Sequence, residues 1–137
     1  MGIKYCEAED IKRIAEDIIK KMCWEHVKLN DIFFLRSVGS SSRGTIARCH
    51  ALSRPLQIAL KREGFYLIEV IHERFDKLSE EEKIKVVIHE LMHIPKAFGG
   101  GFIHHHMVNE SSVEKIFNEY MARKREGESF AKLYISK

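Results

Sequence analysis

Apolar residues recur at helical spacing in three parts of the chain. From Glu7 to His26 they are separated by charged residues and form one stripe, made of Ile11, Ile14, Ala15, Ile18, Ile19 and Met22. A stripe of this period predicts an amphipathic helix that buries one face. The same period predicts a second helix after Ser79 and a third from about Ser112 to Arg125, with an inward face of Val113, Ile116, Phe117 and Tyr120.

Between the helices, shorter apolar runs are rich in the β-branched and aromatic residues that favour strands. Phe65–Ile71 is the strongest strand signal, and Val27–Val38 is a second. We expect a short third strand within Thr45–Ser53, with Ile46 and Cys49 facing inward.

Proline and glycine mark the connections. Pro55 suits the first turn of a short helix, Pro55–Lys61, which we expect Gly64 to close. The tail, Glu126–Lys137, has room for one more short strand. The order of helix, strands, helix and helix predicts an α+β fold in which helices pack on a small twisted sheet.

Composition sets the class of protein. The chain has 137 residues, of which 45% are hydrophobic and 31% charged, so we expect one domain over residues 1–137. No run has the length of a membrane span or the features of a leader. Three widely spaced cysteines form no CxxC pair, which fits a reduced cytoplasmic setting.

The helix after Ser79 carries the candidate chemistry. Ser79 and Glu82 form a capping-box pattern, and Pro95 is expected to end the helix. Near its end stands His89-Glu90-Leu91-Met92-His93. Histidines four residues apart lie on one helix face and can hold one metal ion, and the glutamate beside the first can take a proton from water.

A zinc site needs a third protein ligand and an open position for water. The three glycines at 99–101 allow the chain to reverse, and His104, His105 and His106 follow. In an extended segment, His104 and His106 would share one side and His105 would point the other way. Glu110 or Glu114 is an alternative third ligand.

The run from His89 to His105 resembles the signature of predicted zincin-like metallopeptidases of archaea and their viruses. The shared features are His-Ile-Pro at 93–95, Phe-Gly-Gly at 98–100 and a later histidine, and the resemblance extends over residues 36–106. It implies a zincin-like fold, a zinc ion (Zn²⁺) and peptidase activity. Its spacing selects His105 as third ligand, with His104 as the alternative. The metzincin pattern fails, because Lys96 and Gly99 replace its glycine and third histidine.

The expected reaction is hydrolysis of a peptide or protein substrate. Zinc on His89, His93 and His105 would activate water, and Glu90 would act as general base. Strand Phe65–Phe75 is a candidate edge along which a peptide substrate could pair, and a central position in the sheet is the alternative. Oxyanion donors stay open among Tyr66, Arg48 and Tyr120, and carboxylate partners for the histidines stay open between Glu114 and Glu119.

Two other functions compete with this one. A basic patch could bind nucleic acid, and its members would be Arg36, Arg43, Arg48, Arg54, Lys61 and Arg62. The net charge of only +3 argues against it. A structural, non-catalytic metal site is the second alternative, and it would be closed by four protein ligands rather than three.

Overall fold

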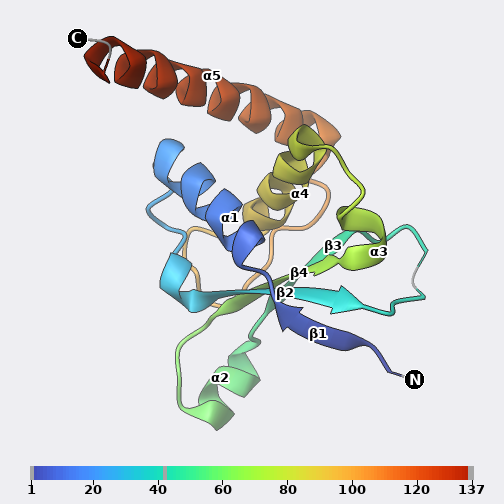
Figure 1. The fold of residues 1–137 in the computed structure, drawn as a ribbon. Helices are drawn as coiled ribbons and strands as arrows, with labels where there is room; N and C mark the ends of the chain where they lie inside the picture. The colour runs from blue at the N-terminus through green and yellow to red at the C-terminus, as the bar shows by residue number, and fades with distance from the viewer. Residues whose placement is uncertain (1, 42, 136–137) are drawn as a thin grey trace.

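A four-stranded sheet forms the base of the molecule in this computed structural model, which describes residues 2–41 and 43–135 (Figure 1). Its strands are β1 (Lys4–Glu7), β2 (Ile32–Val38), β3 (Ala47–Ala51) and β4 (Tyr66–Ile71), in the order β1-β2-β4-β3. β2 and β4 are parallel, whereas β1 and β3 pair antiparallel with their neighbours. β3 is therefore an edge strand, and β4 is central.

The long helices lie on one side of this sheet (Figure 1). They are α1 (Glu9–Lys21), α4 (Glu80–Met92) and α5 (Glu110–Ile135). Two short helices complete the fold, α2 (Arg54–Leu60) at the opposite side and α3 (His72–Phe75) directly after β4, together with a 3₁₀ turn at Leu29–Asp31. The α+β class expected from the sequence is confirmed.

The core lies between the sheet and the helices. Alternate strand residues such as Phe34, Ile68 and Val70 are buried there. α1 contributes Ile11, Ala15 and Ile18, and α4 contributes Ile84, Val87, Ile88 and Leu91. Both stripes match the helical period of the sequence, because burying one apolar face is what stabilises each helix.

Several predicted boundaries were wrong because local capping decides them. α1 ends at Lys21, since Cys23 adopts a left-handed conformation (φ 54°) and Trp24 donates its backbone N–H to the carbonyl of Ile19. This pattern of a left-handed residue with a 6→1 bond is the Schellman motif, which usually uses glycine. Lys61 ends α2 in the same way (φ 55°), so Gly64 does not close that helix.

Other predicted strands differ in extent. The second strand begins at Ile32 rather than Val27, because residues 29–31 form the 3₁₀ turn. Residues 126–135 continue α5 instead of forming a strand, while residues 136–137 lie outside the described part of the chain. β1 was not predicted; all four of its residues are exposed, so it lacks the alternation that identifies half-buried strands.

The central position of β4 overturns one expectation about substrate. A peptide cannot add to β4, because β2 and β3 already pair with its two edges. In addition, residues 72–75 form α3 rather than an extension of the strand. The edge available for pairing beside β4 is that of β3.

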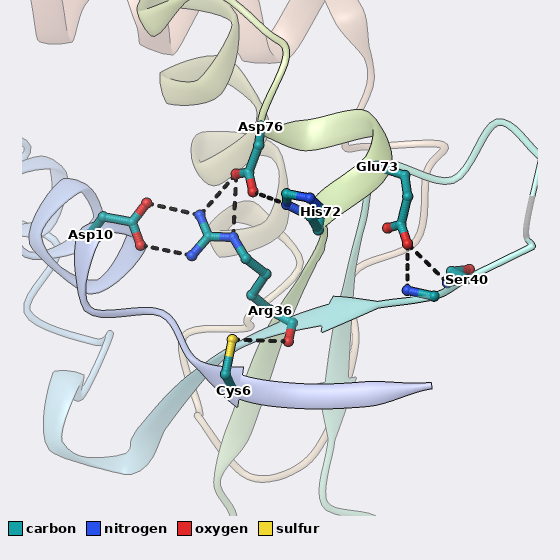
Figure 2. Close-up of polar contacts among 8 residues, drawn as sticks. Cys6, Asp10, Arg36, Ser40, His72, Glu73 and Asp76 are labelled. Carbon is teal, nitrogen blue, oxygen red and sulfur yellow. Dashed lines mark hydrogen bonds and ion pairs between the residues drawn. The ribbon is translucent and has the colours of Figure 1, made fainter. Parts of the chain in front are cut away.

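An ionic network ties α1, β2 and the segment after α3 together (Figure 2). Arg36 donates to both carboxylate oxygens of Asp10, at 3.2 and 2.8 Å, and its Nη2 donates to Asp76 at 2.9 Å. His72 bonds the other oxygen of Asp76. Glu73 accepts hydrogen bonds from the backbone N–H groups of Gly39 and Ser40. Arg36 therefore serves the fold rather than an open basic surface.

Replacing Arg36 should make stability less dependent on pH. The hydrogen bonds from Arg36 hold the pKa of Asp10 below its usual value. A depressed carboxyl pKa stabilises the fold above the unfolded pKa of about 3.9, and this contribution is lost as pH falls through the folded pKa. We expect Arg36→Leu to cost about 1–2 kcal/mol at pH 7, allowing for solvent screening at the exposed Asp10, and much less near pH 3.

Urea unfolding at both pH values measures this difference. Arg13→Leu is the control, because Arg13 is an exposed arginine of α1 with no ion pair among the described residues. An equal loss for Arg36→Leu at the two pH values would contradict the role of the network.

Candidate metal centre

The last turns of α4 place the HExxH residues. Ser79 starts this helix with a capping box: its side chain accepts from the backbone of Glu82, whose carboxylate reaches back to the backbone of Ser79. The helix ends at Met92, three residues before Pro95, as expected from a proline at that position. His89 and Glu90 lie in the last turn, and His93 is the C-cap residue.

Three histidines come together at this end of α4. The candidate ligand nitrogens of His89, His93 and His105 all lie within 4.8 Å of one another. The ring centroids are 4.9 Å apart for His89 and His93, 5.3 Å for His89 and His105, and 4.7 Å for His93 and His105. His104 and His106 are exposed and lie outside this group.

The segment that carries His105 is fixed against His93. The backbone N–H of Ile103 donates to the carbonyl of His93 at 2.8 Å, and the Nδ1 of His93 bonds the carbonyl of Ile103. The His93 ring also stacks on Phe102, with centroids 4.3 Å apart. Because Nδ1 is occupied, the Nε2 of His93 is the atom left for a metal. An N–H bonded to a carbonyl is a usual support for a metal-binding histidine.

The turn at residues 105–107 explains why His105 differs from its neighbours. Met107 and Val108 donate their backbone N–H groups to the carbonyl of His104. The chain is therefore curled rather than extended, and the strict alternation of sides assumed for His104 to His106 does not apply. The curl directs His105 toward α4.

The donor set fits a zinc ion. Tetrahedral zinc at about 2.0–2.1 Å from each nitrogen requires nitrogens about 3.4 Å apart, a separation that lies within the 4.8 Å bound on the three histidine nitrogens. Burial, followed by the charges of His93 and His105, lowers the pKa of His89 to about 4. Burial also lowers the pKa of His93. Neutral imidazoles at neutral pH are the form that binds metal.

Glu90 is buried beside the histidines rather than exposed as a surface charge. Its side chain is only 6% exposed, and burial raises its pKa to about 7. A carboxyl group with a pKa near neutrality can both take and release a proton in this range. Glu90 lines the same cleft as the three histidines.

That cleft has a volume of about 820 Å³ and opens between β3, α4 and the start of α5. The β3 side includes Ile46, Arg48, Cys49 and His50, and the helices add Val86, Val113 and the Lys85–Glu114 ion pair at 2.8 Å. Burial and the nearby charge of Glu90 raise the pKa of Cys49 to about 12, which keeps its thiol protonated. The walls of the cleft beside the histidines therefore combine apolar side chains with charged ones.

Other predicted site residues are dispersed. The Tyr120 hydroxyl bonds Asp17 of α1, and the Tyr66 hydroxyl bonds the glycine turn, so both hydroxyls are occupied elsewhere.

Arg48, the third candidate for an oxyanion donor, does line the cleft. Glu110 and Glu114 line it as well but lie outside the histidine group, while Glu119 pairs with Arg123.

Three of the six residues of the predicted basic patch pair with acids. Arg36 pairs with Asp10 and Asp76, and Arg48 and Arg62 each have a carboxylate within 4 Å. No helix of the described residues is long and apolar enough to cross a membrane.

Sequence reasoning missed the groups that support the histidines. Phe102, the carbonyl of Ile103, Gln57 and Tyr66 all contact the loop or its ligands. Backbone groups give no sequence signal. The side chain of Gln57 gave no signal either, since a glutamine in a short helix is usually exposed, whereas this one is 4% exposed.

Comparison with models of known protein families gives a match over most of the chain. The sequence model of the family described as "Putative phage metallopeptidase" matches residues 3–122, which includes the sheet, α4 and all three histidines. No curated protein and no solved structure gives a significant match.

Proposed function

Because the chain belongs to this phage metallopeptidase family, we propose that it is a zinc-dependent peptidase with His89, His93 and His105 as metal ligands and Glu90 as general base. The proposal includes a zincin-like arrangement, in which one helix supplies two ligands and the base, and a later loop supplies the third ligand. Its substrates are peptides or proteins.

One observation carries this proposal. Three histidines converge in a cleft beside a buried carboxyl group, and two of them come from the same helix as that carboxyl group. Among the described residues, the converging group holds three ligands. A structural zinc site is closed by four protein ligands, whereas a catalytic site leaves the fourth position open. The geometry therefore favours catalysis over the structural alternative.

The chemistry divides between the metal and Glu90. When bound, zinc supplies a Lewis acid that polarises the scissile carbonyl and lowers the pKa of water. Glu90 takes a proton from the attacking water and passes it to the leaving amine. Its burial suits this role, since a carboxyl group with a pKa near 7 releases the proton as readily as it takes it. His93, held by the carbonyl of Ile103, keeps its orientation throughout.

The substrate is proposed to lie along β3. This strand forms one wall of the cleft, and β4 occupies only one of its two edges. An extended peptide can pair its main chain with the other edge and thereby bring a peptide bond over the histidines. Arg48 is the one sequence-predicted oxyanion candidate that lines the cleft, where Lys85 also lies but is paired with Glu114.

Metal analysis tests the proposal directly. We expect the purified protein to carry about one zinc per chain and to hydrolyse an unstructured protein such as casein. A strong chelator should abolish hydrolysis, and added zinc should restore it, because the three ligand residues already lie together in the folded chain. A chain that takes up no zinc would refute the metal site, and hydrolysis that survives complete metal removal would refute the mechanism.

A further inference from the structure

The loop that presents His105 has no regular secondary structure, so its position depends on side chains from elsewhere. It runs from Gly99 to His106, between the end of α4 and the start of α5. We propose that the Tyr66 hydroxyl and the Gln57 side-chain amide are positioning groups that hold the glycine turn and so aim His105 at the metal. This inference rests on the proposed function, because it assumes that His105 is a ligand.

Tyr66 supplies the first anchor. It comes from β4, the central strand of the sheet, and its side chain is fully buried. Its hydroxyl donates to the carbonyl of Gly101 at 2.8 Å and accepts from the backbone N–H of Gly100 at 3.0 Å. One oxygen thus bonds a donor and an acceptor of consecutive residues, which fixes the orientation of the turn as well as its position.

Gln57 supplies the second anchor, from α2. It is the buried residue of α2, and its Nε2 donates to the carbonyl of Gly99 at 2.9 Å and to that of Leu52, also at 2.9 Å. Gly100 sits so close that a Cβ there would lie 2.4 Å from Gln57 Nε2 and 2.4 Å from the Leu52 carbonyl oxygen. Its φ of +98° is also a left-handed value that suits glycine. The turn is therefore held by side chains from two separate elements, β4 and α2.

The anchors connect directly to the ligands. Gly101 is followed by Phe102, which stacks on His93, and by Ile103, whose N–H and C=O both bond His93. His105 lies two residues beyond Ile103. A shift of the turn therefore moves His105 relative to His89 and His93. Apolar side chains could fill the same space, but they would leave the N–H of Gly100 and the carbonyls of Gly99 and Gly101 without these partners.

Tyr66→Phe tests this role against a matched control. Tyr120→Phe removes the hydroxyl of another buried tyrosine, 2% exposed, which bonds Asp17 far along the chain from the loop. We expect Tyr66→Phe to weaken zinc binding at least about 10-fold in a chelator competition, as loss of supporting hydrogen bonds does in metal sites. Tyr120→Phe should bind zinc as the wild type does.

Two further measurements separate positioning from general stability. Unfolding of the metal-free proteins should show both variants folded, and the visible spectrum of the cobalt-substituted protein should change for Tyr66→Phe alone. Gln57→Glu, which replaces the donating amide with a carboxylate facing two carbonyls, should weaken zinc binding in the same direction.

The outcomes distinguish the two proposals. Suppose that the wild type binds zinc and that Tyr66→Phe and Gln57→Glu both keep its zinc affinity and its cobalt spectrum. That result would overturn the positioning role but leave the proposed function intact. Equal weakening by Tyr66→Phe and Tyr120→Phe would also overturn it, because the effect would then follow stability. A folded wild type that binds no zinc would overturn the proposed function and this inference with it.

Discussion

Glu90→Gln is expected to keep the metal and to lose peptide hydrolysis. Glutamine has nearly the shape of glutamate but cannot take a proton, so only the transfer from water to the leaving amine is removed. General bases contribute about 10²–10⁴-fold to rate, and we expect a loss in that range. The assay is hydrolysis of casein by variants with equal zinc content.

Burial makes this a selective change. Glu90 is 6% exposed, and burial alone raises its pKa to about 7, which indicates that the charged form is costly to bury in the metal-free protein. A neutral amide avoids that cost, so the variant should fold at least as well as the wild type. Glu119→Gln is the control, since that exposed glutamate pairs with Arg123 on α5. Full activity in Glu90→Gln would refute the role of Glu90 as base.

His105→Ala and His104→Ala should differ sharply in metal binding. His104 and His105 are adjacent in sequence and both are exposed, so we expect the two substitutions to disturb the fold about equally. Only His105 has a nitrogen within 4.8 Å of those of His89 and His93. Loss of one of three protein ligands should weaken zinc binding by more than about 100-fold, beyond what loss of a supporting hydrogen bond costs.

The same pair of variants decides between the two candidates for the third ligand, namely His105, which the spacing selects, and His104, its alternative. Chelator competition on both variants gives the affinities, and His106→Ala provides a further control within the same cluster. If His104→Ala proved to be the weaker binder, the loop would have to rearrange on metal binding, and the assignment of His105 would be wrong.

The sequence specified α4 closely because its signals are local. The capping box at Ser79 and Glu82, the buried stripe through Leu91 and the proline after His93 each depend on residues within a few positions. For the same reason, the pairing of His89 with His93 on one helix face followed from spacing alone. The boundaries that failed, at Cys23 and Lys61, used left-handed residues other than glycine, for which the sequence holds no dependable signal.

Strand order was beyond local reasoning. The residues of β4 fit either a central or an edge strand, and only the pairing with β2 and β3 shows that it is central. Exposed β1 gives no apolar alternation, yet it pairs along its length with β2. Sheet pairing joins segments tens of residues apart, so it depends on contacts that no short pattern contains.

The sequence by itself determined the chemical components of the site: two histidines and a glutamate on one helix face, and a histidine cluster after a glycine turn. The resemblance favoured His105 of that cluster over His104, whereas the tertiary structure alone decided which strand borders the cleft and which side chains hold the turn. The physical reason is that helical periodicity arises from bonds four residues apart, whereas the position of His105 depends on Tyr66 and Gln57, hydrogen-bonded to the turn from β4 and α2.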